Sequence, residues 1–146
     1  MARLDFDVDE FLALPLTARL ATNGPTVRPV WYLWEGGSFW ILTGSWARLP
    51  KRVEDDPAVA IVADDCDLAT GTVRQVIARG EAELLPFDIA RGRRMLSRYL
   101  GAAEECWDPR FRRYLHGQPD SKQAIWLRLQ PRTLSATDLS YAHKTD

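Results

Sequence analysis

Three short segments carry side chains that could hold a planar anion. They read RPVW at Arg28–Trp31, LTGSWAR at Leu42–Arg48 and RQV at Arg74–Val76. Arginine binds phosphate through two parallel hydrogen bonds, hydroxyls donate to phosphate oxygens, and an amide can hydrogen-bond with the edge of a heterocycle. Taken singly, each of these residues is most often an ordinary solvated strand residue. Together they predict a site for an anionic, planar ligand.

The glutamine in the third segment raises a separate question. In TVRQVIARG, Thr72–Gly80, the apolar residues suit a mostly buried strand, yet Gln75 interrupts them. An amide buried without hydrogen-bond partners costs about 1–3 kcal/mol. We therefore expect Gln75 to face another strand, water or the polar edge of a ligand.

Composition limits the classes of protein to which the chain can belong. With 146 residues, 46% hydrophobic, 27% charged and a net charge of −1, it is typical of one soluble globular domain. The near-neutral charge argues against a general nucleic-acid or acidic-membrane binder. No apolar run is long enough to span a membrane, and the two cysteines form neither a disulfide framework nor a metal motif. We expect a cytoplasmic protein without a metal site.

Turn residues divide the first half of the chain into β-strands. After a short helix capped by Asp7, the pairs Asn23–Gly24 and Gly36–Gly37 separate the runs ARLAT, TVRPVWYLW and SFWILT. Pro29 lacks an N–H, which predicts an edge or a bulge in the second run. Two further strands are expected at 58–64 and 72–85, the latter with a bulge at Gly80.

The second half is expected to add helices and a last strand. A short helix is predicted in SWARLPKRVEDDP, and DIARGRRMLSRYLG predicts a helix ending at Gly101, with Ile89 and Met95 toward its buried side. The last strand is expected at 124–136. The fold class is therefore mainly β: one six-stranded antiparallel barrel over 1–146, with its core at about 17–136 and a loose tail at about 137–146. Because so small a barrel fills with side chains, a ligand should bind outside it, at a subunit boundary.

The order of these motifs resembles that of the pyridoxamine 5'-phosphate oxidase family, and more broadly of the split-barrel flavin and deazaflavin oxidoreductases. The oxidases have an R-x-V-L strand, a Y-T-N-x-x-S-R-K loop, an N-P pair and then R-Q-V-x-x-x-G. This chain has RPVW, LTGSWAR, DP at Asp56–Pro57 and RQVIARG, in the same order across about residues 17 to 85.

The resemblance implies a homodimeric split barrel with FMN at the two-fold interface, where the flavin ring carries out hydride transfer. It implies that one strand lies along the FMN, and that this strand contributes Arg28, Pro29, Val30 and Trp31. It places Thr43, Ser45 and Arg48 near the phosphate, and Gln75 at the isoalloxazine or the ribityl chain. No catalytic side chain is implied.

Departures from the family pattern argue against one of the family's activities. A lysine that follows the loop arginine in the family falls on Leu49, so Lys51 or Arg52 would have to compensate for the lost phosphate cation. The lysine that the oxidases use toward the substrate phosphate falls on Leu33, and a C-terminal R-x-H pair is missing. Oxidation of pyridoxamine phosphate is therefore not expected.

Two other functions stay open. The same fold could use the deazaflavin F420 as a dissociable cosubstrate, which the loss at Leu49 and the arginines after residue 90 favour mildly. Those arginines could equally form a solvated face balanced by nearby carboxylates. A non-enzymatic carrier or sensor of a planar ligand such as haem or flavin is the third possibility. The tryptophans could either stack on a cofactor or pack a dimer core.

Overall fold

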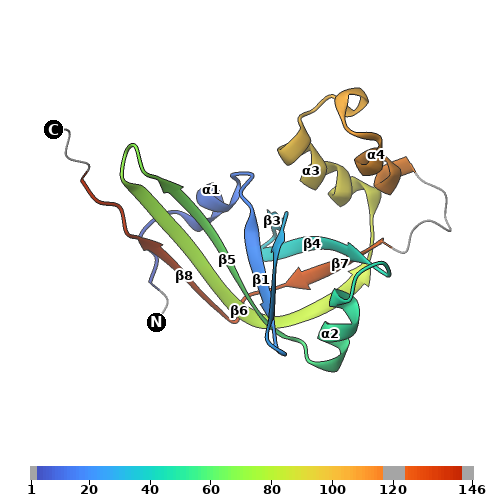
Figure 1. Ribbon diagram of the computed structural model, residues 1–146, viewed down its shortest axis with the longest axis horizontal. Helices are drawn as coiled ribbons and strands as arrows, with labels where there is room; N and C mark the ends of the chain where they lie inside the picture. Colours follow the sequence, from blue (N-terminus) through green and yellow to red (C-terminus); the bar gives the residue numbers. More distant parts are fainter. Residues whose placement is uncertain (1–2, 117–123, 143–146) are drawn as a thin grey trace.

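The computed structural model describes residues 3–116 and 124–142, and Figure 1 shows how its elements are arranged. Strands make up most of the chain, with two short helices before β5 and a helical layer late in the sequence. The elements in chain order are α1 (Val8–Leu12), β1 (Ala18–Thr22), β2 (Thr26–Val30), β3 (Leu33–Glu35), β4 (Ser38–Gly44), α2 (Leu49–Asp55), β5 (Ala58–Asp67), β6 (Thr72–Pro86), α3 (Ile89–Leu100), a 3-10 turn (Glu104–Cys106), α4 (Pro109–His116), β7 (Ala124–Leu129) and β8 (Thr133–Asp138).

The strands form two half-sheets that share one long strand. The larger half-sheet has the order β2-β1-β5-β6-β8, and the smaller half-sheet has the order β6-β7-β4-β3. All of these named pairs are antiparallel, and the 15-residue β6 belongs to both halves. The predicted mainly β antiparallel barrel with helical additions is therefore confirmed.

The strand count differs from the prediction because two runs are broken. The run expected as one strand over 26–34 stops at Trp31–Tyr32, where α3 takes over the backbone hydrogen bonds. The N–H of Tyr32 donates to Tyr99 Oη at 3.0 Å, and the Tyr32 carbonyl accepts from Arg98. The run over 124–136 is likewise broken between β7 and β8. Eight strands result instead of six.

Proline and glycine positions mostly meet their predicted roles. β2, which contains Pro29, is an edge strand with regular pairing to β1. Gly36 and Gly37 have φ of 62° and 75° in the β3–β4 turn, as an Asn-Gly-like hairpin requires. The bulge predicted at Gly80 is wrong, because pairing with β5 runs through it without a skipped residue. There β6 instead exchanges β8 for β7, and a Cβ on Gly80 would lie 3.0 Å from the Gln130 carbonyl oxygen.

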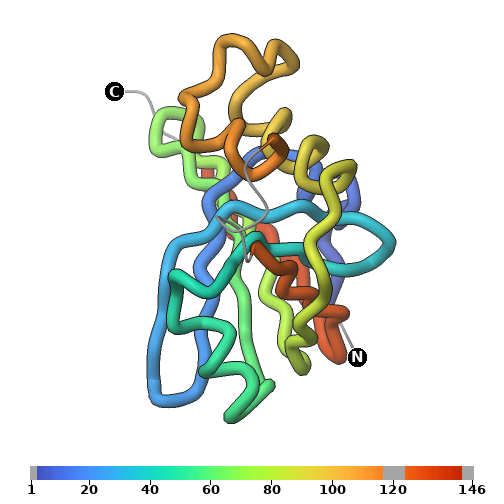
Figure 2. The backbone as a smooth tube through the Cα atoms, turned by 90° about the vertical axis from the view of Figure 1, so that its right-hand side faces the viewer, coloured from blue at the N-terminus to red at the C-terminus, as the bar shows by residue number. Residues whose placement is uncertain are grey.

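Helices α3 and α4 cover the smaller half-sheet, and Figure 2 shows both at one end of the barrel. Asp7 caps α1 and Gly101 (φ 93°) ends α3, as predicted. Ile89, however, is 48% exposed, whereas Met95 is buried. The buried side of α3 passes through Gly92 instead, because its bare Cα leaves room for a neighbouring phenylalanine ring.

Two hydrophobic clusters follow from this arrangement. One fills the barrel between the half-sheets, and the other lies between the smaller half-sheet and the helices α3 and α4. The loose tail expected over about 137–146 is not loose at its start, since β8 reaches Asp138 and the Tyr141 N–H donates to the Gly71 carbonyl. Residues 143–146 lie outside the described residues. Among the helices of the described residues, none has the length and apolar character needed to cross a membrane.

Candidate functional site

An apolar cleft of about 240 Å³ lies where the end of β2 meets the loop after β4 and the helical layer. Three of the residues predicted from the sequence line it: Pro29, Val30 and Trp31. The remaining lining comes from β4, its following loop, α3 and α4: Leu42, Trp46, Met95, Leu96, Phe111 and Tyr114. The sequence analysis missed the helical residues. Their only signal is the spacing of Phe111 and Tyr114, which puts two rings on one helix face.

Trp31 is held by stacking inside the protein. Its ring lies 4.4 Å from that of Tyr99 with an interplanar angle of 4°, and 5.3 Å from that of Phe111 with an angle of 22°. Trp40 is buried and meets Trp126 edge-on at 6.1 Å. Trp31 and Trp40 therefore pack within the protein, and a ligand in the cleft would contact a Trp31 ring that is already held by its neighbours.

Trp46 is different, because it is 55% exposed and lies at the cleft. It occupies a turn closed by the Ala47 N–H and the Gly44 carbonyl, 3.0 Å apart. Its ring centroid is 5.7 Å from that of Tyr114. A Cβ built on Gly44 would overlap the six-membered ring of Trp46, so the indole rests directly on the bare glycine. The end of β4 thus seats a large ring over one side of the cleft.

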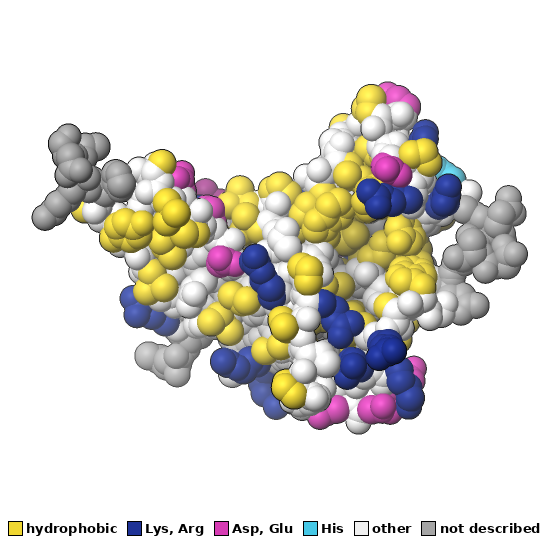
Figure 3. Space-filling view, viewed as in Figure 1, with side chains coloured by type: hydrophobic (Ala, Val, Ile, Leu, Met, Phe, Trp, Pro, Cys, Tyr) yellow, Lys and Arg dark blue, Asp and Glu magenta, His cyan; other side chains and the backbone are white. Residues whose placement is uncertain are grey.

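Three arginines, which we call the basic cluster, belong to β2 and α2: Arg28 lies in β2, Arg48 is the N-cap of α2, and Arg52 lies within α2. Figure 3 shows basic side chains concentrated over this end of the molecule, below an apolar area that continues under α3 and α4. Within residues 3–116 and 124–142, no carboxylate forms an ion pair with any of the three. Lys51, by contrast, pairs with Asp55 at 2.7 Å on the solvent side of the helix.

The two predicted hydroxyl residues occupy different environments. Ser45 is exposed in the turn before α2, within the chain segment that leads to Arg48. Thr43 is buried in β4, and strand alternation puts it in the same row as the fully buried Ile41. Leu42 faces the cleft instead, so Thr43 points toward the barrel interior.

Gln75 lies apart from the other predicted residues. Val76 and Ala78 are fully buried, so alternation puts Gln75 on the opposite, outer face of the larger half-sheet, where it is partly exposed. Its register partners are Asp64 and Thr137. Figure 1 shows the start of β6 at the far end of the molecule from α2. Within one chain, Gln75 therefore does not join the cleft.

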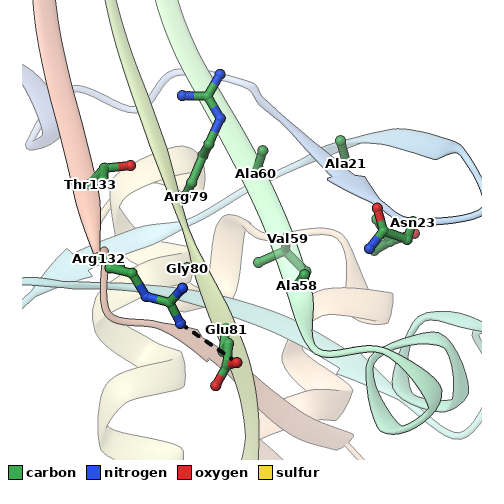
Figure 4. Close-up of a pocket in the computed structure, with 11 residues that line it drawn as sticks. Ala21, Asn23, Ala58, Val59, Ala60, Arg79, Gly80, Glu81, Arg132 and Thr133 are labelled. Carbon is green, nitrogen blue, oxygen red and sulfur yellow. Dashed lines mark ion pairs between the residues drawn. The ribbon is translucent and has the colours of Figure 1, made fainter.

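A second cavity, of about 450 Å³, opens on that same outer face near the bend of β6. Its polar groups include Asn23, Arg79 and the pair of Glu81 with Arg132, whose charged atoms are 3.6 Å apart. Figure 4 shows the Arg79 side chain pointing away from that pair. None of the residues predicted for the ligand lines this cavity.

Two arginines of α3 form contacts within the protein, with carboxylates and with a tryptophan ring. Arg91 lies 3.7 Å above the Trp40 ring and pairs with Asp88 at 2.8 Å, and Arg94 pairs with Glu35 at 2.7 Å. Two hydrogen bonds from Arg94 hold the pKa of the Glu35 carboxyl below its usual value. For Arg91 and Arg94, the interpretation of the arginines after residue 90 as a face balanced by carboxylates is thereby supported.

Arg98 and Tyr99 fasten the chain segments around β2 to α3. Arg98 donates to the carbonyls of Leu12, Leu14 and Tyr32, and Tyr99 Oη donates to the Leu16 carbonyl at 2.8 Å. Burial raises the pKa of Tyr32 to about 12 and also raises the pKa of Tyr99. Both phenols therefore stay protonated near neutral pH and act as structural donors. In the described ranges, no three His, Cys, Asp or Glu side chains converge as metal ligands.

Comparison with known proteins connects this geometry to a family. A search of curated proteins finds no match. The structure is similar to a conserved hypothetical protein, Rv2991 from Mycobacterium tuberculosis, with 22% identity, a TM-score of 0.74 and coverage of 100% of this chain and 95% of the other.

Two further solved structures share the fold. An F420 reductase is 22% identical, with a TM-score of 0.64 and coverage of 87% and 94%. A FAD binding protein from Mycobacterium smegmatis is 16% identical, with a TM-score of 0.60 and coverage of 92% and 98%. The sequence profile described as pyridoxamine 5'-phosphate oxidase matches residues 4–138. The chain therefore belongs to the pyridoxamine 5'-phosphate oxidase family, in its split-barrel fold.

Proposed function

We propose that the protein is an FMN-binding oxidoreductase that passes hydride or electrons to a small organic molecule. The observation that carries this proposal is an aromatic cleft that begins at Pro29, next in the chain to Arg28, an arginine that has no carboxylate partner among the described residues. Apolar walls with a few convergent polar groups are typical of cofactor sites. FMN combines a flat ring with a phosphate, which these two neighbouring surfaces suit.

The chain's own residues would bind and orient the cofactor. Arg28 and Arg48 would hold the phosphate, with Ser45 donating to one of its oxygens. Pro29 and Val30, on the edge strand β2, would lie along the ring system, and the stacked Trp31 would fix its position. The flavin supplies the hydride chemistry when it is bound, while the apolar cleft excludes water from its ring. This assignment needs no acid or base from the protein.

A second copy of the chain would complete the site. Gln75 faces outward at the far end from α2, so it can contact a cofactor only in a neighbouring molecule. The outer face around it is rich in small and aliphatic side chains that are partly exposed, including Ala60, Val62 and Ile77. A homodimer that buries this face would bring Gln75 of one copy toward the flavin of the other. In such a dimer, the outward-facing amide of Gln75 would hydrogen-bond to the flavin bound by the partner copy.

F420 is the second candidate cofactor. It also joins a planar ring to a phosphate, so the same cleft and basic cluster would suit it, and one structural neighbour is an F420 reductase. A carrier that binds such a ligand without turnover would use the same surfaces. An assay with an electron donor distinguishes the two, because an enzyme would reduce its substrate in repeated cycles and a carrier would not.

Absorbance spectra from 300 to 700 nm test the proposal. The purified protein is measured alone and after addition of FMN or, separately, F420. We expect the bands of one cofactor to shift on binding, and Arg48→Ala and Gln75→Ala to weaken that binding. Arg113→Ala, at an exposed position of α4 that does not line the cleft, serves as a control. A protein that binds neither cofactor would remove the oxidoreductase proposal.

A further inference from the structure

Within residues 3–116 and 124–142, four arginines have a buried Nε for which no hydrogen-bond partner is found: Arg28, Arg52, Arg74 and Arg91. In two of them the guanidinium charge is nevertheless paired. Arg74 contacts Asp65 at 2.9 Å, and Arg91 contacts Asp88 at 2.8 Å. In the described part of the chain, Arg28 and Arg52 have no such carboxylate. Burying part of a charged group without enough hydrogen-bond partners costs folding free energy. Arg28 and Arg52 therefore differ from Arg74 and Arg91, whose charges are paired.

The two arginines meet at the same hairpin turn. Arg28 Nη2 lies 3.3 Å from the Thr26 hydroxyl, and Arg52 Nη1 lies 3.3 Å from the point where a Cβ on Gly24 would be. Gly24 and Thr26 are two residues apart in the turn between β1 and β2. Two guanidinium groups thus reach the same turn, one from β2 and one from α2. An anion bound at this turn would offset the repulsion between the two like charges.

The carboxylate that ends α2, Asp56, has other partners. Asp56 accepts from the Asn23 amide at 2.6 Å and from the Ala58 N–H at 3.1 Å. The Asn23 hydrogen bond lowers the pKa of Asp56, so it stays ionised without an arginine. Lys51 is also committed, since it is paired with Asp55 and its side chain is 73% exposed.

We propose that Arg52, together with Arg28, clamps the phosphoryl group of the bound cofactor and replaces the cation that Leu49 does not supply. This proposal rests on the proposed function for the identity of the ligand and assigns a residue within that site. Arg52 lies one helical turn after Leu49, on a neighbouring part of the α2 surface. The clamp would recognise a phosphate monoester or diester, and it would contribute little to binding of the ring.

Paired ligands separate binding of the phosphate from binding of the ring. The dissociation constants of FMN and riboflavin are measured by flavin fluorescence for the native protein, Arg52→Gln and Lys51→Gln. One charge-assisted contact is worth about 1.5–3 kcal/mol, which corresponds to about 10–100-fold in affinity. We expect Arg52→Gln to weaken FMN by that factor and riboflavin less than about twofold. Lys51→Gln should leave both unchanged, and Arg52→Lys should weaken FMN by an intermediate amount.

Equal losses for FMN and riboflavin in Arg52→Gln, or a larger loss in Lys51→Gln, would overturn the proposal. Thermal midpoints of all variants establish that they are folded. If the native protein binds neither flavin but binds F420, the same comparison uses F420 and its phosphate-free deazaflavin.

Failure of all these cofactors would remove the proposed function but still leave the clamp testable with inorganic phosphate. A phosphate-dependent rise in the thermal midpoint that is present in the native protein and absent in Arg52→Gln would support the clamp. No rise in the native protein would refute it.

Discussion

Replacing Gly44 with alanine should displace Trp46 from the cleft. The backbone of Gly44 does not have a positive φ, so alanine fits the strand conformation itself. The new methyl group, however, would occupy the space of the six-membered ring of Trp46. Because the indole is 55% exposed, it can swing outward, and the rest of the barrel need not move.

The cost of this displacement follows from the area that Trp46 buries. A tryptophan buries about 150–250 Å² when fully enclosed, so the buried part of this half-exposed residue is about 100 Å². At about 25 cal/mol per Å², its loss costs at most about 2.5 kcal/mol. Since unfolded chains already bury some of this area, we expect Gly44→Ala to lower the free energy of unfolding by about 1–2 kcal/mol.

A double-mutant cycle measured by urea denaturation tests this reasoning. In a Trp46→Ala background the steric conflict is gone, so Gly44→Ala should then be neutral or stabilising by about 0.4–1 kcal/mol. Ser45→Ala, in the same turn but without this contact, is the control and should change stability by less than about 0.5 kcal/mol. The same loss from Gly44→Ala in both backgrounds would refute the idea that Trp46 rests on Gly44.

Three further changes test the helical layer. Arg98→Met should lower the free energy of unfolding by about 1.5–3 kcal/mol in urea denaturation, because three backbone carbonyls lose a charged donor. The carbonyls of Leu14 and Tyr32 keep the hydroxyls of Tyr32 and Tyr99 as donors, which limits the loss. Glu35→Gln should cost about 1 kcal/mol at pH 7. Since Arg94 lowers the folded-state pKa of Glu35, this difference should be full above the unfolded value of about 4.3 and vanish as pH falls through the folded-state pKa; a pH-independent difference would contradict it. Gly92→Ala should lower the free energy of unfolding by about 1–3 kcal/mol, seen as a lower thermal midpoint in circular dichroism, because its Cβ would lie 2.5 Å from Phe87 Cζ inside the core.

Local signals in the sequence were enough to predict much of the fold. The turn at Gly36–Gly37, the cap at Asp7 and the end of α3 at Gly101 each depend on a few neighbouring residues, and each is confirmed. The break after β2 could not be predicted in this way. It depends on Arg98 and Tyr99, which are distant in sequence and bind backbone groups that a strand would otherwise use.

The candidate site was predicted only in part for a similar reason. The family resemblance named Val30, which lines the cleft, but a sequence motif does not say which face of a strand each side chain occupies. Gln75 illustrates the limit, because its place on the outer face depends on the burial of its neighbours. The proposal of Arg52 rather than Lys51 depends on the ion pair between Lys51 and Asp55, which the sequence alone does not reveal.

The sharing of β6 by both half-sheets has a consequence for how the molecule opens. Neither half can separate without breaking pairs along the same strand, so the barrel should unfold in one cooperative transition. Amide hydrogens in the middle of β6 should exchange with solvent only through that global event, whereas those at the exposed edge of β2 exchange through local fraying. A ligand bound at the cleft would therefore slow exchange throughout β6, including the part that pairs with β5 and β8 far from the ligand.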